Sequence, residues 1–433
     1  MPFLPTSRSD REELLETIGI QDAGRLFAAI PERALFKGIL KVDGPFDELE
    51  LRRRFDAPPS RVVFAGGGIY RHYIPALVDA LATRQEFLTA YTPYQPEISQ
   101  GTLQATFEFQ SMMAALTGMD ASNASMYDGA TAFAEAALMA ARAKPIRRII
   151  VTRSTNPAYR AVLRTYFRNS PGIEIVEAPF DPSSGRVDMQ TLEDLVSQDA
   201  ALFIQQPNYF GVIEDLHGIS RISARAGFWG VVVTDAVSLG LLDPPGSFGC
   251  DVVVGEAQSF GNPANAGGPL LGFFCVKKAH LRRMPGRVVG LSRDHAGNRA
   301  FCLTLSTREQ HIRREKATSN ICTNEGLCAL RAAIYLGALG PRGLRGVAVQ
   351  CAAGARSLAA ALKDKGVDPF FDAPMFHEFV VRMDGGLIRK LGERGIVAGI
   401  PLDEDYPELG GGLLMNVTEM NTTEDIRCLT ELL

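Results

Sequence analysis

The residues with the clearest chemical potential follow two predicted strands near the middle of the chain. One hydrophobic run ends in Asp235, and the next one, residues 251–256, leads toward Ser259. An aspartate in such a position can pair with the protonated ring nitrogen of pyridoxal phosphate, and a lysine just past the following strand can bind the aldehyde as a Schiff base. Ser259 stands where that lysine is expected, and no lysine occurs between Lys144 and Lys277. The sequence therefore predicts a cofactor pocket from which the nucleophile is missing.

A second candidate feature is the start of a predicted helix over residues 133–141, which residues 125–132 lead into. A Gly/Thr turn that opens a helix offers free backbone N–H groups and the positive end of the helix dipole, and both suit a phosphate. The alternative is an ordinary helix start, and the aspartate at the strand end can likewise simply cap the following turn. The first interpretation gives a vestigial cofactor pocket made of Asp128, Gly129, Thr131, Asp235 and Ser259.

Residues 91–101 form the most site-like surface segment of the sequence. Two prolines stiffen it, so its polar tips can face a small charged ligand at little entropic cost. The alternative is that an aromatic loop of this kind packs in a subunit interface. The candidate lining residues are Tyr91, Tyr94, Gln95, Glu97, Ser99 and Gln100.

Basic residues and small hydroxyls gather in residues 308–324, between two predicted domains. Such a segment can bind an anion, but most charge-rich segments are solvated helix starts held by salt bridges. His311 lies here without a visible acid partner, so a Ser/His/Asp catalytic arrangement has little support. His72 can stack on a pyridine ring, although a structural role is more common for such a histidine.

Composition limits the class of protein. Hydrophobic residues make up 46% and charged residues 22% of the 433 residues, which is typical of a folded globular chain. The net charge of −4 argues against nucleic acid or an anionic membrane as the main partner. The seven cysteines show no CxxC or Cys/His ligand spacing, which predicts reduced thiols and no metal site. No apolar leader or membrane-length run is present, so a soluble, cytoplasmic protein is expected.

Three regions are predicted along the chain. Residues 1–60 look like an N-terminal arm without a core of its own, which would pack on another domain or subunit. Residues 61–315 alternate Val/Ile-rich strands with helices, which indicates an α/β domain with a mainly parallel sheet. Residues 316–433 read as two alanine-rich helices followed by strand, helix, strand and helix, a smaller α+β domain.

Together these segments resemble the pyridoxal-phosphate-dependent glycine decarboxylases, the P-proteins of the glycine cleavage system. More narrowly, the chain is similar to subunit 1, the N-terminal half in organisms that split the protein into two chains. Residues 64–69 are more glycine-rich than the family pattern, and the region around Asp405 matches by pattern rather than by identity. The resemblance covers almost the whole chain and is carried by residues 70–75, 87–101, 123–131, 254–256, 267–269, 307–324, 405–409 and 417–419.

The resemblance implies a type I pyridoxal-phosphate (aminotransferase-like) fold and a heteromeric enzyme. Subunit 2 would carry the lysine and the cofactor, and this chain, inactive alone, would complete the active site. The complex, a two-plus-two heterotetramer, would decarboxylate glycine and pass the aminomethyl group to the lipoyl arm of the H-protein. The loop of residues 91–100 would line the pocket, and three residues would reach the partner's phosphate: Thr318, Ser319 and Asn320.

Two other functions remain open from the sequence. The chain could be a self-sufficient pyridoxal-phosphate lyase or transferase that uses another lysine. Lys277 and Lys278 follow a strand but open a basic segment, and Lys316 belongs to the domain junction. The chain could also be a non-catalytic scaffold homologue. Borohydride trapping of pyridoxal phosphate on the purified chain would distinguish a self-sufficient enzyme from a subunit. Glycine-dependent carbon dioxide exchange after addition of the second subunit would distinguish a subunit from a scaffold.

Overall fold

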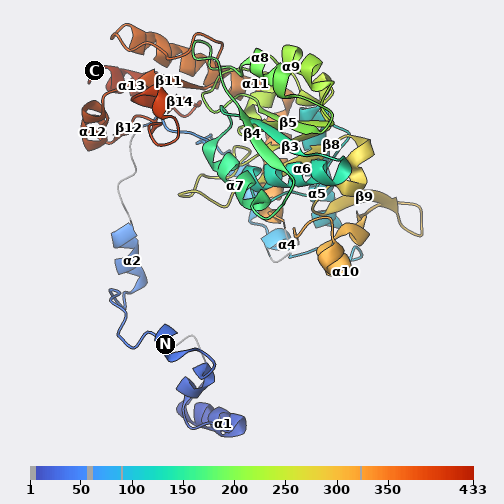
Figure 1. Cartoon of the computed structure of the whole chain (residues 1–433). Coiled ribbons are helices and arrows are strands. Elements are labelled where there is room, and N and C mark those ends of the chain that lie inside the picture. The colour runs from blue at the N-terminus through green and yellow to red at the C-terminus, as the bar shows by residue number, and fades with distance from the viewer. Residues whose placement is uncertain (1–5, 56–61, 89–90, 322–323) are drawn as a thin grey trace. The chain divides into compact units, whose positions relative to one another are not determined.

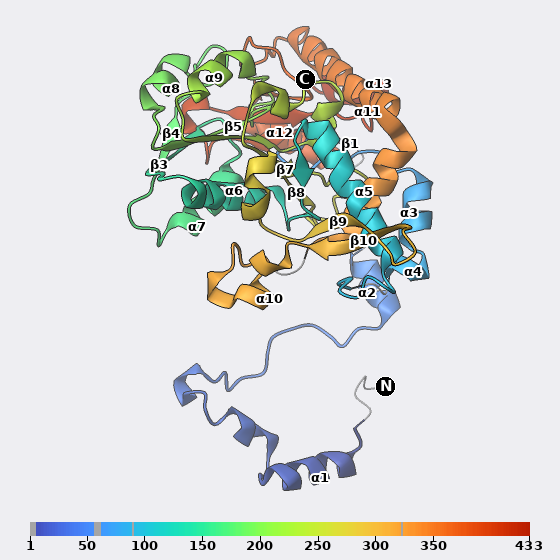
Figure 2. The same ribbon diagram turned by 90° about the vertical axis from the view of Figure 1, so that its right-hand side faces the viewer.

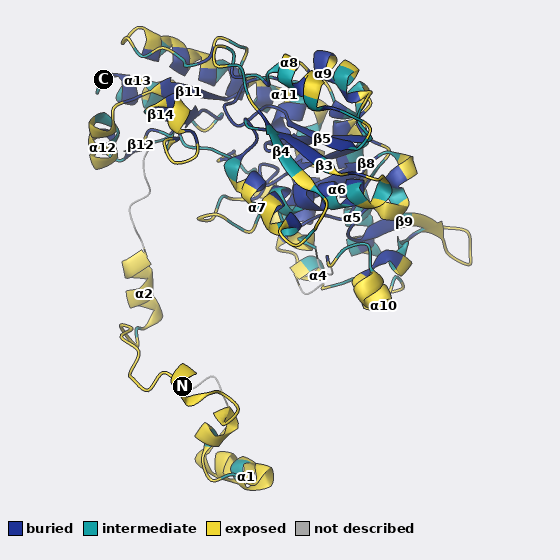
Figure 3. Ribbon diagram, in the orientation of Figure 1, coloured by how far each residue is buried: buried dark blue, intermediate teal, exposed yellow. Residues whose placement is uncertain are grey.

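The computed structural model describes residues 6–55, 62–88, 91–321 and 324–433, and the chain divides into two compact units, Met1–Pro59 and Ser60–Leu433. The first unit contains the helices α1 (Arg8–Ile18) and α2 (Glu48–Phe55), and neither buries a residue. Figure 3 shows most of this unit in the colour of exposed residues. Ser7 caps α1 in a capping box with Asp10. Within the second unit, a boundary between residues 315 and 316 stays a prediction.

A seven-stranded sheet forms the centre of the second unit (Figures 1 and 2). Its five consecutive strands from β7 to β4 are parallel, and β8 and β2 close the other edge in antiparallel pairing. The predicted mainly parallel sheet is therefore confirmed. In spatial order the strands are β2 (Ala121–Ser122), β8 (Gly272–Val276), β7 (Val252–Glu256), β6 (Phe228–Val233), β5 (Ala200–Gln205), β3 (Arg148–Thr152) and β4 (Glu174–Ala178).

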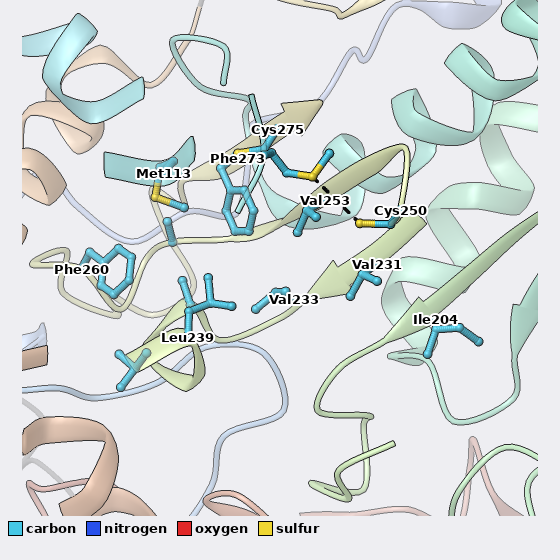
Figure 4. Packing of buried hydrophobic residues seen from close by; sticks show 14 of the residues in the cluster. Met113, Ile204, Val231, Val233, Leu239, Cys250, Val253, Phe260, Phe273 and Cys275 are labelled. Atoms are coloured by element: carbon cyan, nitrogen blue, oxygen red, sulfur yellow. Dashed lines mark hydrogen bonds between the residues drawn. The ribbon is translucent and has the colours of Figure 1, made fainter. Parts of the chain in front are cut away.

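Both faces of this sheet are buried because successive side chains of a strand point to opposite sides. On one face, Val232 and Phe203 pack with α6 (Gly129–Ala143) and α7 (Pro157–Phe167). On the other face, Val231, Val253 and Phe273 pack with Met113 and Phe260, as Figure 4 shows. The helices on this second face are α5 (Gln100–Thr117), α8 (Met189–Leu195), α9 (Leu216–Ser223) and α11 (Gly326–Lys363).

Helix α11 links the sheet region to the C-terminal elements. It bends at Gly340, whose φ of 60° is left-handed, and Pro341 follows. This bend separates the two alanine-rich helices that the sequence predicts. A second hydrophobic cluster then joins α11 to the C-terminal strands and helices. These elements are β11 (Glu378–Arg382), α12 (Gly385–Glu393), β12 (Ile396–Val397), β13 (Ile400–Pro401), β14 (Gly412–Asn416) and α13 (Thr423–Thr430), with β1 (Val62–Val63) paired to β12.

An antiparallel hairpin that the sequence analysis did not identify lies beside α5. Its strands are β9 (Val288–Arg293) and β10 (Arg299–Thr304). Gln110 of α5 exchanges two hydrogen bonds with the backbone of Val289. The short helix α10 (Gln310–Arg313) follows the hairpin in the chain. Two other helices, α3 (Ala76–Ala82) and α4 (Gln85–Leu88), precede α5. Among the described residues, no helix combines the length and apolar character that crossing a membrane requires.

Candidate functional site

Asp235 lies just beyond the end of β6, at the centre of the sheet, and is 1% exposed. The neighbouring strand β7 is parallel to β6, so the ends of both strands meet at one edge of the sheet. One carboxylate oxygen of Asp235 accepts a hydrogen bond from the backbone N–H of Val237 at 3.1 Å. Asp235 therefore caps the turn after its strand, which was the simpler of the two interpretations, and its second oxygen remains available for a stronger partner.

Two imidazoles of the chain itself face that second oxygen. Nε2 of His377 lies 2.7 Å from Oδ2 of Asp235, and Nε2 of His72 lies 3.6 Å from it. Nδ1 of His72 is 2.8 Å from Oε2 of Glu419, an oxygen that also accepts from the thiol of Cys351 at 3.3 Å. His72 is thus engaged on both ring nitrogens, as expected of a structural histidine.

Burial and charge oppose each other in this cluster. Burial alone would raise the pKa of Asp235, but His377 and His72 hold that pKa well below its ordinary value. Burial alone would lower the pKa of His72, but Asp235, Cys351 and Glu419 raise it well above its ordinary value. Both shifts favour the charged forms. The carboxylate that a cofactor's ring nitrogen would need is already neutralised from within the chain.

The start of α6 is the predicted phosphate cradle, and a carboxylate occupies part of it. Asp128 is the N-cap of α6 and accepts from the backbone N–H of Thr131 at 2.7 Å. The backbone N–H of Gly129 donates to Oε2 of Glu256 at 2.9 Å. The other oxygen of Glu256 accepts from the N–H groups of Leu271, at 2.7 Å, and of residue 258, at 2.9 Å. An amide that a phosphate would use is therefore bonded to a side chain of β7.

Glu256 is 2% exposed, and this burial is costly for a carboxylate. Burial raises the pKa of Glu256 to about 7, although its three backbone donors favour the charged form. From the sequence, Glu256 was expected only to end a strand and to belong to a run shared with the family, with no role in a site. A carboxylate that ends a buried run of valines needs hydrogen-bond donors within the fold. That requirement could have predicted a polar role for Glu256.

Ser259, at the lysine position, lies in the turn after β7 and is 2% exposed. Lys277 lies at the far end of β8, where its ammonium donates to the backbone oxygen of Gly249, and Lys316 is exposed. Pyridoxal phosphate does not fit this pocket. The residue at the covalent anchor is a serine, the ring-nitrogen partner faces two imidazoles, and an amide at the helix start is bonded to Glu256.

The loop of residues 91–100 presents most of its predicted lining residues to solvent. The side chains of Tyr91 and Tyr94 are 81% and 51% exposed, and Gln95 and Glu97 are also exposed. Ser99 is half-buried at the start of α5. Gln100 turns inward instead, where its side-chain amide bonds to both the N–H and the C=O of Phe301 at 2.9 Å.

A polar cluster that the sequence analysis missed adjoins this loop. Nη2 of Arg287 donates to the hydroxyl of Tyr94 at 3.1 Å. His311 has an acid partner after all, because its Nδ1 lies 3.6 Å from Oε2 of Glu309. Arg287 also lines a cavity of about 260 Å³, whose other walls include Tyr91, Thr102, Asn324 and Leu330.

The three residues predicted to reach a partner's phosphate follow α10. The backbone N–H of Thr318 donates to the carbonyl of Arg308 at 3.0 Å, and Ser319 Oγ accepts from the N–H of Ile321 at 3.2 Å. Ser319 also lies beside the buried Glu135 of α6, whereas Asn320 is exposed. Asn320 is thus the most accessible of the three.

The family model described as "Glycine cleavage system P-protein" matches residues 1–433. The probable glycine dehydrogenase (decarboxylating) subunit 1 of Moorella thermoacetica is 48% identical over 440 residues, covering 99% of this chain and 98% of that protein. Its counterpart in Carboxydothermus hydrogenoformans is 44% identical over 444 residues, covering 100% and 99%.

Solved structures show the same relationship. A glycine decarboxylase (P-protein) of the glycine cleavage system, crystallised in inhibitor-bound form, superposes with a TM-score of 0.86 at 41% identity, covering 100% of this chain and 99% of that chain. A cysteine desulfurase from Escherichia coli superposes with a TM-score of 0.63 at 16% identity, covering 90% and 98%, and so shares the fold alone. The predicted type I pyridoxal-phosphate fold is confirmed.

Proposed function

Because the chain belongs to the glycine cleavage system P-protein family, we propose that it acts as subunit 1 of a glycine dehydrogenase (decarboxylating). In this proposal a second subunit holds pyridoxal phosphate. The two subunits together decarboxylate glycine and transfer its aminomethyl group to the lipoyl arm of the H-protein. The bound cofactor supplies the electron sink for the loss of carbon dioxide, and this chain completes the site around it.

One observation carries the assignment of these roles: this chain closes its own cofactor pocket. His377 faces Asp235 at 2.7 Å, Glu256 bonds to the start of α6, and Ser259 stands at the lysine position. A chain of this family with such a pocket needs a partner that supplies the cofactor. The same observation argues against the alternative of a self-sufficient lyase or transferase.

The surface of the chain supports a heteromer. In the first unit, large apolar side chains, among them Phe36, Ile39 and Phe55, are not buried within that unit itself. We propose that this unit packs on the partner subunit in a two-plus-two heterotetramer. A cytoplasmic location stays a prediction.

Within the complex, this chain's contribution is to bind and orient. Tyr91, Tyr94 and Glu97 are exposed, and in this proposal they line the partner's pocket and orient the glycine carboxylate or the lipoyl arm. Asn320, with Thr318 and Ser319 behind it, would contact the partner's phosphate. A rigid wall of this kind excludes water and holds substrates in reactive geometry.

Reconstitution tests the proposal. The purified chain is incubated with pyridoxal phosphate and borohydride, and we expect no trapped cofactor. After addition of the second subunit and lipoylated H-protein, we expect glycine-dependent exchange of carbon dioxide, with the cofactor trapped on the second subunit. Cofactor trapped on this chain would favour a self-sufficient enzyme. Exchange by the second subunit alone at the full rate would favour a scaffold role.

A further inference from the structure

Four side chains from three separate segments meet beside the loop of residues 91–100. Cζ of Arg287 lies 5.3 Å from the ring centroid of Tyr94, and Nη2 of Arg287 donates to the Tyr94 hydroxyl at 3.1 Å. The ring of His311 meets the ring of Tyr94 edge-on at 5.8 Å. Glu309 lies behind them, with Oε2 at 3.7 Å from Nε of Arg287 and 3.6 Å from Nδ1 of His311.

Arg287 is the most deeply buried residue of this cluster. It is 4% exposed, and its backbone carbonyl accepts from the N–H of Ala124 at 2.8 Å, which ties it to the segment before α6. Glu309, itself 5% exposed, balances its charge. Burying an arginine with one carboxylate is costly unless its donors are used. Among the described residues, the hydroxyl of Tyr94 accepts a hydrogen bond from this guanidinium, whereas Nε of Arg287 has no hydrogen-bond partner, and Tyr94 is 51% exposed.

The direction of this hydrogen bond determines what Tyr94 can do. A guanidinium donates only, so the phenol oxygen of Tyr94 must accept from Arg287. Its own proton then points elsewhere, and among the described residues Arg287 is the hydrogen-bond partner of that hydroxyl. No other described residue accepts this proton, so it is directed to solvent or to a bound substrate. Tyr94 as a whole is 51% exposed, which gives such an acceptor access to this side chain.

We propose that Arg287, braced by Glu309, is a positioning residue that fixes Tyr94 to donate a hydrogen bond to a substrate oxygen in the complex. The proposal rests on the function proposed above. Two substrate groups offer this chemistry, the carboxylate of glycine and the amide carbonyl of the lipoyl arm. Both groups present an oxygen atom that can accept a hydrogen bond from the hydroxyl of a tyrosine at the surface.

A double-mutant cycle on the reconstituted complex tests the proposal. Tyr94→Phe removes only the hydroxyl, and Arg287→Lys keeps the charge beside Glu309 but loses the planar fork. We expect each single variant to lower kcat/KM about ten-fold, and the double variant to be no worse than Tyr94→Phe alone. A purely structural Arg287 would instead give additive losses, and additive losses would overturn the proposal. Tyr166→Phe on α7 is the matched control, and its kcat/KM should equal that of the wild type.

The kinetic constants separate the two substrate oxygens. A raised KM for glycine in Tyr94→Phe assigns the acceptor to the glycine carboxylate, and a raised KM for the lipoylated protein assigns it to the arm. Wild-type constants in Tyr94→Phe would overturn this proposal while the proposed function stands. Absence of glycine-dependent exchange in the wild-type complex would instead overturn the proposed function, so the two failures are distinguishable.

Discussion

Nε2 of His377 lies 2.7 Å from Oδ2 of Asp235, so that an imidazole of the chain itself faces the carboxylate at the end of the central strand β6. Asp235 comes from the large sheet, and His377 immediately precedes β11 of the C-terminal sheet. Their contact therefore joins the seven-stranded sheet to the three-stranded sheet of β11, β14 and β13. Where the fold offers a cofactor site, this chain has a buried contact between its own carboxylate and imidazole, which links the two sheets.

His72 also lies beside Asp235, and its contribution to stability depends on pH. Its pKa is raised in the folded chain, so its stabilisation is complete below the unfolded value of about 6.5 and is lost as pH rises through the folded pKa. We expect His72→Gln to lower the free energy of unfolding by about 3 kcal/mol at pH 6 and by less at pH 9. Urea unfolding at both pH values measures the difference. The exposed His217→Gln is the control, and an equal loss at both pH values would contradict the prediction.

Glu256 produces a pH dependence in the lower part of the same range. Its pKa rises from about 4.3 in the unfolded chain to about 7 in the folded one, so the folded state binds the proton more tightly. Wild-type stability should therefore fall as pH rises through this window, by about 3 kcal/mol between pH 5 and pH 8 relative to Glu256→Gln. Unfolding of both proteins at the two pH values gives the comparison. The stability of the control variant at the exposed Glu393, Glu393→Gln, should change with pH as the wild type does. If the stability of Glu256→Gln also followed the wild-type pH dependence, Glu256 would not be its source.

The sequence predicts the parts of this region that depend on local patterns. The valine runs predict β6 and β7, and the residue types around Asp128 predict the start of α6. The pairing of Asp235 with His377 was not predictable, because it requires the packing of one sheet against the other. The β9–β10 hairpin was also missed, since its strands are only partly buried, and the second half of β9 is exposed.

The closed pocket predicts that restoring the lysine will not restore cofactor binding. In Ser259→Lys the new amine would lie in a turn that is 2% exposed, while His377 and Glu256 keep their present partners. We expect the variant to give no yellow, borohydride-trappable species with pyridoxal phosphate, and to unfold more easily because a buried amine lacks a partner. The second subunit serves as the positive control. Stoichiometric trapping by folded Ser259→Lys would show that the pocket is open.

Gln100 anchors the loop of residues 91–99, and this anchor can be tested by mutation. Its side chain donates to the carbonyls of Pro96 and Phe301 and accepts from the N–H of Phe301, so it ties the loop to β10. Gln100→Ala leaves the buried backbone groups of Phe301 without these partners, which should cost about 1–3 kcal/mol. We expect faster hydrogen exchange at the Phe301 amide and a lower kcat/KM in the complex, because the loop loses its anchor. Gln104→Ala, one turn further along α5, removes only a bond to Glu108 and should change neither. Unchanged exchange at Phe301 in Gln100→Ala would mean that other contacts fix the loop.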